Sequence, residues 1–289
     1  MSMTLSDSAG ADYRNARYFA IACELAYLDE ASARPPFLER LGLDARLVSN
    51  DNTQVYVGEN DASIVVAFRG SESPATLDGI KDWLLTNADN FLIIPEGRIG
   101  TDFAAAGVGA RFHKGFMSAL ADIWEPLYAA VDAAVKRKDR PLWVTGHSLG
   151  GALALLAAWR LQQQFLPVHQ IYTFGAPMVG NKAAADAFER EFPDKIFRFV
   201  DSFDVVPKLP TVSLITNSYD HCLSEMLLEA KVAAASSASP AVEMMKSFAG
   251  KTVDGVLSAT LIDELWGTLK ARIQHHMMAN YQERVEEKC

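Results

Sequence analysis

Ser148 lies at the centre of a pentad, residues 146–150, that reads Gly-His-Ser-Leu-Gly and so has the form G-x-S-x-G. An apolar run, residues 142–144, precedes the pentad, and a stretch rich in alanine and leucine, residues 149–165, follows it. A sharp turn between a strand and a helix projects a serine hydroxyl over the end of a sheet, and glycines let the backbone pass closely there. The pattern therefore predicts a serine nucleophile. The alternative is an ordinary turn before a buried helix.

A serine nucleophile needs a base and an acid, because a free hydroxyl reacts poorly at neutral pH. In hydrolases built on this turn the acid and then the histidine follow the serine along the chain. Three histidines lie far enough beyond Ser148 to follow an acid as well: His221, His275 and His276. The residue pattern alone leaves all three open as the base.

Two carboxylates are placed to serve as the acid. A predicted strand, residues 196–200, is followed by Asp201 and, three residues later, by Asp204. A loop that leaves a strand can aim a carboxylate at an imidazole. Either aspartate fits this role, and either could instead be a solvated turn residue.

An oxyanion hole requires two N–H groups directed at the substrate carbonyl oxygen. The first should be the backbone N–H of Leu149, which directly follows the nucleophile. The second should come from the loop after an early strand, and the run Arg69-Gly70-Ser71 follows such a strand. The alternative for that loop is a simple turn that ends the strand.

The elements that must position these residues alternate between helix and strand. The spacing of apolar residues predicts helices at 13–30, 116–136, 149–165 and 181–191, and strands at 53–57, 63–68, 142–146, 170–174 and 196–200, with a possible last strand at 212–216. This alternation is typical of an α/β fold with a mostly parallel sheet flanked by helices. We expect one domain over residues 1–289. Within it, residues 222–275, rich in Ala, Leu and Met, are expected to form a helical insertion or cap.

Composition narrows the class of partner. The net charge of −9 argues against nucleic acid or an anionic membrane as an electrostatic partner. The three cysteines are widely spaced, which favours neither a disulfide framework nor a metal site. No apolar run approaches the 18 residues of a membrane span, and no signal peptide is recognised. A reduced cytoplasmic protein is the default expectation, with secretion as the alternative, and the oligomeric state is left open.

Six segments, in this order, resemble the class 3 lipases, a family of α/β-hydrolase fold that includes the filamentous-fungal triacylglycerol lipases. The segments are Phe68-Arg69-Gly70-Ser71, Asp82-Trp83, His113-Lys114-Gly115-Phe116, residues 144–152 around the pentad, Tyr172-Thr173-Phe174-Gly175-Ala176-Pro177, and Asp204-Val205-Val206-Pro207. The resemblance covers residues 15–221 and resumes at 275–285, where a tyrosine follows His276 by five residues.

The resemblance implies a role for each candidate. It implies Ser148 as nucleophile, Asp204 as acid and His276 as base, with His275 and His221 as the less favoured alternatives. It implies that Ser71 supplies the second oxyanion N–H beside Leu149, and that its hydroxyl adds another donor. It also implies that residues 72–90 form a lid that moves at a lipid surface.

The function implied is a lipase that acts on acylglycerols at a lipid–water interface, with no metal or organic cofactor. The alternatives are a soluble carboxylesterase, a feruloyl esterase or a phospholipase A1 on the same framework. A catalytically silent, lipase-like interaction module is the remaining alternative. The chain differs from the secreted fungal enzymes in its long segment between His221 and His276 and in having no obvious disulfide pair.

Overall fold

The computed structural model describes residues 2–7, 10–50, 53–71, 92–208, 219–222, 225–229, 267 and 272–289. The expected lid at 72–90, the possible strand at 212–216 and most of the segment 222–275 lie outside the described residues.

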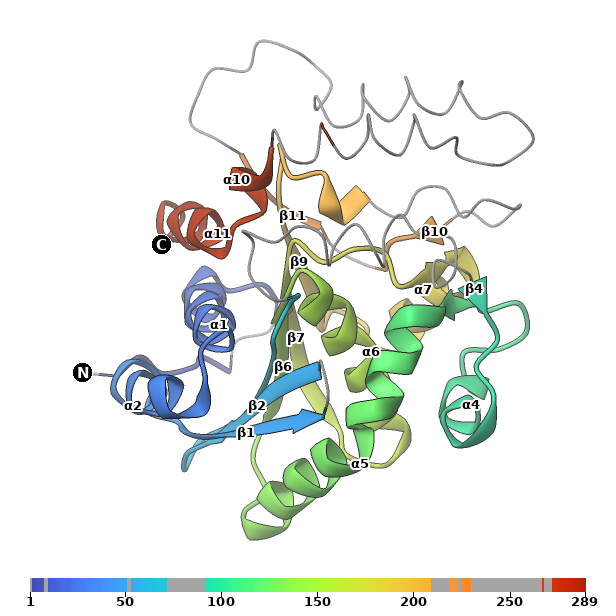
Figure 1. The fold of residues 1–289 in the computed structure, drawn as a ribbon, viewed down its shortest axis with the longest axis horizontal. Coiled ribbons are helices and arrows are strands. Elements are labelled where there is room, and N and C mark those ends of the chain that lie inside the picture. Colours follow the sequence, from blue (N-terminus) through green and yellow to red (C-terminus); the bar gives the residue numbers. More distant parts are fainter. Residues whose placement is uncertain are drawn as a thin grey trace.

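A seven-stranded sheet forms the centre of the described fold, in the order β1-β2-β3-β6-β7-β9-β11 (Figure 1). Its strands are β1 (Asp44–Asn50), β2 (Thr53–Glu59), β3 (Ile64–Phe68), β6 (Leu142–His147), β7 (Val168–Phe174), β9 (Ile196–Asp201) and β11 (Glu225–Leu228). The pairs β1–β2 and β2–β3 are antiparallel, whereas every pair from β3 to β11 is parallel. The expected α/β class with a mostly parallel central sheet is therefore confirmed.

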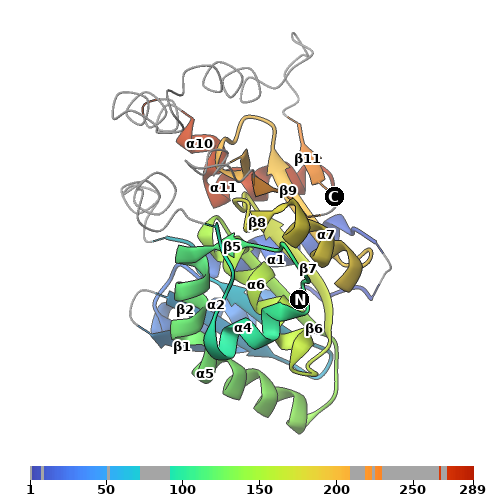
Figure 2. The ribbon, with the colours of Figure 1, turned by 90° about the vertical axis from the view of Figure 1, so that its right-hand side faces the viewer.

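Helices cover both faces of this sheet (Figure 1). One face carries α1 (Tyr13–Leu25), α2 (Glu30–Leu41) and α11 (Met278–Glu286), and the other carries α4 (Gly97–Ala104), α5 (Lys114–Arg137), α6 (Leu149–Gln163) and α7 (Lys182–Glu191). In Figure 2 the second face is turned toward the viewer. The four-residue helix α10 (Ile273–His276) directly precedes α11, and a 3₁₀ turn, η1 (Val206–Lys208), follows β9.

A second, smaller sheet lies beside α7 and α5. Its order is β10-β8-β5-β4, and its strands are the two-residue pairs Tyr219–Asp220, Gly180–Asn181, Phe112–His113 and Leu92–Ile93.

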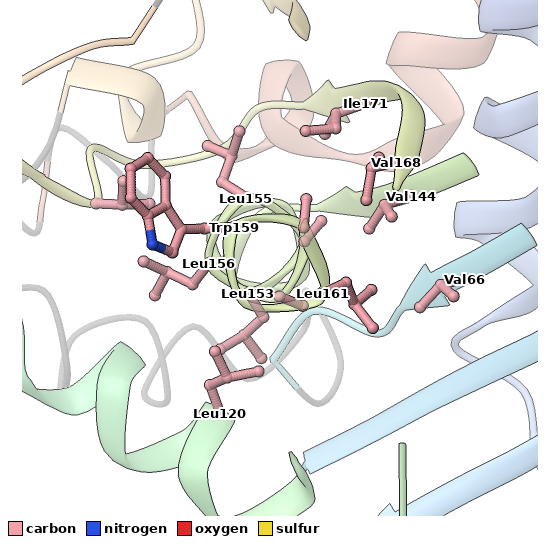
Figure 3. Packing of buried hydrophobic residues seen from close by; sticks show 14 of the residues in the cluster. Val66, Leu120, Val144, Leu153, Leu155, Leu156, Trp159, Leu161, Val168 and Ile171 are labelled. Atoms are coloured by element: carbon pink, nitrogen blue, oxygen red, sulfur yellow. The ribbon is translucent and has the colours of Figure 1, made fainter. Parts of the chain in front are cut away.

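The two faces of the central sheet bury two separate apolar clusters. Successive side chains of a strand point to opposite faces, so Val66 joins the cluster under α5 and α6 while Val65 and Ala67 join the cluster under α1. Figure 3 shows α6 surrounded by apolar side chains, with Val144 of β6 on one side and Leu120 of α5 on another. Because α6 is buried nearly all round, its first turn is held firmly against the sheet.

The structure differs from the sequence-based expectations at two places and adds two elements. The first helix ends at Leu25 instead of residue 30, and Tyr27 lies in the turn beyond it. Helix α2 and strand β1 were not predicted. Helix α2 buries only Ala33, Phe37 and Leu41, and it contains two prolines, which are rare inside helices. Its sequence therefore gives only a weak helix signal. The segment 222–275 does not begin as a helix, because Glu225–Leu228 forms the edge strand β11.

Candidate active site

The candidate site lies where the parallel strands end. Phe68 at the end of β3 is beside Gly146 of β6, His147 is beside Phe174 of β7, and Phe174 is beside Phe199 of β9. In open α/β sheets the loops beyond the carboxyl ends of the strands form the binding crevice. The loops after β3, β6, β7 and β9 therefore meet at one edge of the sheet.

Ser148 occupies a strained turn between β6 and α6. Its backbone has φ 57° and ψ −130°, in a region that residues with a side chain seldom adopt. The Ser148 N–H donates to the Phe174 carbonyl at 2.9 Å, which ties the turn to β7. A Cβ on Gly146 would collide with the Gly150 carbonyl, so glycine is required where the strand and the helix meet.

Ser148, His276 and Asp204 form a hydrogen-bonded chain. His276 Nε2 is 2.8 Å from Ser148 Oγ, and His276 Nδ1 is 2.8 Å from Asp204 Oδ2. A carboxylate only accepts, so the neutral imidazole carries its proton on Nδ1 and accepts the serine hydroxyl proton at Nε2. All three residues are buried. The arrangement can move a proton from the serine to the imidazole while the carboxylate holds the ring.

The Asp204 carboxylate is held in its ionised form. Burial acts to raise its pKa, but the His276 imidazole and hydrogen bonds from His276, Tyr281 and the Val206 N–H outweigh burial and lower that pKa. The Tyr281 hydroxyl donates to Oδ2 at 2.6 Å, and the Val206 N–H donates to Oδ1 at 2.9 Å. The carboxylate therefore stays charged and fixed in direction.

Gly175, directly after β7, packs against Asp204 and His276. Gly175 has φ +58°, and a Cβ there would lie 2.9 Å from Asp204 Oδ2 and 3.1 Å from His276 Cε1. A side chain at this position would be strained and would push the acid and the imidazole apart.

His147, the second residue of the pentad, supports the backbone of His276. Its Nε2–H donates to the His276 carbonyl at 2.7 Å, and its Nδ1 accepts from the Tyr27 hydroxyl at 2.8 Å. Burial, and then the neighbouring His276, lower the His147 pKa to about 3, so the ring is neutral at pH 7. A neutral ring can donate from one nitrogen and accept at the other, as these two bonds require.

The loop after β3 lies against the first turn of α6. A Cβ on Gly150 would be 2.5 Å from the Phe68 carbonyl oxygen and 2.7 Å from that of Arg69. Gly70 in turn packs against the Tyr27 hydroxyl. This contact brings the loop that carries Ser71 next to the turn that carries Leu149. An oxyanion role for these two residues stays a prediction.

The less favoured candidates have other partners. His221 donates through Nε2 to the Pro207 carbonyl, and burial lowers its pKa to about 3. His275 Nδ1 lies 3.6 Å from Asp201 Oδ1. The two aspartates thus face different histidines, with Asp201 near His275 and Asp204 bonded to His276.

Among the described residues, no cluster of three or more His, Cys, Asp or Glu side chains could hold a metal ion. Over the same residues, no helix has both the length and the apolar character to cross a membrane.

Sequence reasoning missed four residues that shape the site: Tyr27, His147, Asn280 and Tyr281. Two of them stood next to recognised signals, since His147 is part of the pentad and Tyr281 follows His276 at a family-like spacing. Tyr27 carries no such signal, because the helix predicted at 13–30 extends over it, whereas α1 ends at Leu25.

The family model described as "Lipase (class 3)" matches residues 65–214, more than half of the 289-residue chain. This range contains the loop after β3, the pentad and the acid loop, whereas His276 lies beyond it.

Two curated relatives illustrate the range of similar proteins. Secreted mono- and diacylglycerol lipase 3 of Gibberella zeae is 32% identical over 163 residues, 55% of this chain and 48% of that protein. The chloroplastic phospholipase A(1) DAD1 of Arabidopsis thaliana is 30% identical over 167 residues, 55% of this chain and 36% of that protein. The chain thus matches about half or less of the length of these relatives.

A solved structure, the Lip2 lipase of Yarrowia lipolytica, shares the fold. It aligns with a TM-score of 0.60 at 20% identity, over 76% of this chain and 80% of that one.

Proposed function

The chain belongs to the class 3 lipase family, and from that premise we propose that it hydrolyses carboxylic esters, acylglycerols foremost, through a Ser148–His276–Asp204 triad. The observation that carries the proposal is the continuous chain of two 2.8 Å hydrogen bonds that joins the three side chains. Similarity to a mono- and diacylglycerol lipase supports the substrate class.

The proposed reaction follows from this geometry. Ser148 Oγ attacks the ester carbonyl carbon while His276 Nε2 takes its proton. Asp204 stabilises the imidazolium that forms, and the N–H groups of Leu149 and Ser71 bind the oxyanion. His276 then protonates the departing alcohol, and water activated by the same imidazole releases the acid from the acyl-enzyme.

A phospholipase A1 is the second candidate, favoured by the 30% identity to the chloroplastic phospholipase A(1). Both activities use the same chemistry and differ in the head group that the site accepts. Emulsified triacylglycerol, diacylglycerol and phosphatidylcholine, offered side by side with a chain-length series of aryl esters, separate the two candidates.

Three substitutions test the proposed chemistry. Ser148→Ala should abolish ester hydrolysis and fluorophosphonate labelling in a folded protein, and His276→Ala should lower kcat by at least roughly 10³-fold. His221→Ala is the matched control and should cost less than about tenfold, because its ring bonds Pro207 instead of Ser148. Activity that survives Ser148→Ala, or a greater loss in His221→Ala than in His276→Ala, would refute the triad.

A further inference from the structure

Two side chains hold the backbone at His276, one at the carbonyl of His276 and one at the carbonyl of His275. The His276 carbonyl accepts from His147 Nε2 at 2.7 Å. The His275 carbonyl, directly before it, accepts from Asn280 Nδ2 at 3.1 Å. The imidazole therefore projects from a peptide segment that is fixed on either side.

Asn280 is itself anchored by a buried carboxylate. The same Nδ2 donates to Asp201 Oδ2 at 2.8 Å, and Asp201 Oδ1 accepts from the Phe203 N–H at 2.8 Å. The Asp201 side chain is 0% exposed, and the Arg284 guanidinium lies 3.5 Å from Oδ2. A buried carboxylate with several donors has a strongly preferred position, so it makes a rigid anchor.

The anchor and the acid sit on one turn. Asp201 ends β9, and the Asp204 N–H donates to the Asp201 carbonyl at 3.0 Å. Asp204 points at the His276 ring, while Asp201 reaches the His276 backbone through Asn280. This single turn therefore holds the base at two points, directly at the imidazole and, through Asn280, at the preceding peptide.

We propose that Asn280, held by Asp201, is a positioning residue that sets the place of the His276 imidazole between Ser148 and Asp204. The inference rests on the proposed function and deepens it. Helix α10 ends at His276 after only four residues, so its own hydrogen bonds give it little rigidity. A displacement of about 1 Å at a reacting group lowers rates by as much as roughly 10²-fold.

The test is Asn280→Ala, measured against Gln282→Ala as matched control. Gln282 is also an amide of α11, and its Nε2 donates to the Ala20 carbonyl at 3.3 Å and to Glu24 at 2.9 Å. These two bonds fasten α11 to α1 and involve no atom of His276. At a temperature where both variants are folded, Asn280→Ala should lower kcat on a soluble aryl ester about 10- to 100-fold with KM unchanged, and should slow fluorophosphonate labelling in parallel. Gln282→Ala should keep kcat within about twofold.

Asp201→Asn provides the second variant. It keeps the shape of the side chain but replaces one carboxylate oxygen by an N–H₂ group and removes the charge, so the bond that anchors Asn280 becomes weaker. It should lower kcat in the same direction as Asn280→Ala, by a smaller factor and without a change in KM. Asn280→Ala with wild-type kcat, or an equal loss in Gln282→Ala, would overturn the proposal. Loss of the fold in both Asn280→Ala and Asp201→Asn would overturn it too, because the contacts would then serve stability. A wild-type protein that is neither active nor labelled would contradict the proposed function instead.

Discussion

At the residue scale, the candidate site depends on how buried polar groups satisfy one another. Tyr281 shows this best, because its hydroxyl donates to Asp204 at 2.6 Å and accepts from the Asp201 N–H at 3.2 Å. Tyr281 is fully buried, and burial, followed by the charge of Asp204, raises the pKa of its hydroxyl well above the usual value. The hydroxyl therefore stays protonated and remains a donor to the acid.

Tyr281→Phe should weaken both activity and stability. The Asp204 carboxylate loses one donor, and the buried Asp201 N–H loses its acceptor, which together should cost about 1–3 kcal/mol of unfolding free energy. We expect kcat to fall roughly 3- to 10-fold, since the acid is less firmly directed at His276. Urea unfolding and ester hydrolysis measure the two effects.

Tyr18→Phe is the control for this prediction. Tyr18 is also buried, and its hydroxyl donates to the Leu41 carbonyl at 2.9 Å, in a contact that does not involve the site. It should lose a similar amount of stability and keep its kcat. Equal kcat in the two variants would mean that the Tyr281 hydroxyl serves stability alone.

At the scale of the elements, the sharp turn between β6 and α6 is the part that the sequence predicted best. Strand, turn and helix appear as expected because a short apolar run, a G-x-S-x-G pentad and a helix that is apolar nearly all round each leave a strong local pattern. Helix α2 and strand β1 were missed because they bury few side chains. The Asn280–Asp201 contact was also missed, since hydrogen bonds between side chains 79 residues apart leave no periodic signal.

Gly150→Ala tests how tightly the loop after β3 is packed on α6. The added methyl group would lie 2.5 Å from the Phe68 carbonyl oxygen, so the loop must shift. Such overpacking costs about 1–3 kcal/mol, and the shift should move Ser71 away from Leu149. We expect a lower melting temperature and a fall in kcat of at least roughly tenfold.

Gly267→Ala is the matched control, because a Cβ there has none of the described residues within 4 Å. Thermal unfolding and kcat of this variant should equal those of the wild type. If Gly150→Ala were as active as Gly267→Ala, the loop after β3 would have no part in binding the oxyanion.

At the scale of the whole molecule, both ends of the described chain contribute to the site. Tyr27 follows α1, and Tyr281 lies on α11, which packs with α1 in the same apolar cluster. An ion pair between Arg17 and Glu286 also joins these helices at the surface. The site therefore forms only when the first and last helices dock on the same face of the sheet, so global unfolding and loss of the site should coincide.

Two neutral histidines, the buried His147 and the partly buried His221, should make that global stability depend on pH. His147 and His221 have pKa values lowered to about 3, in both cases chiefly by burial, whereas an unfolded chain has a histidine pKa near 6.5. Above pH 6.5 neither state binds the proton, so the full stability is present. Below it the unfolded state takes up protons that the folded state refuses, and the free energy of unfolding falls by up to about 1.4 kcal/mol per pH unit for each histidine.

His221→Gln isolates one of these two contributions. The glutamine amide can still donate to the Pro207 carbonyl, but it cannot take up a proton. Urea unfolding between pH 7 and pH 4.5 should give a pH dependence shallower than that of the wild type by up to about 1.4 kcal/mol per pH unit, with no difference in slope above pH 7. Parallel curves for the two proteins would show that His221 takes up its proton equally in the folded and the unfolded state, so that the contact of its ring with Pro207 does not lower its pKa.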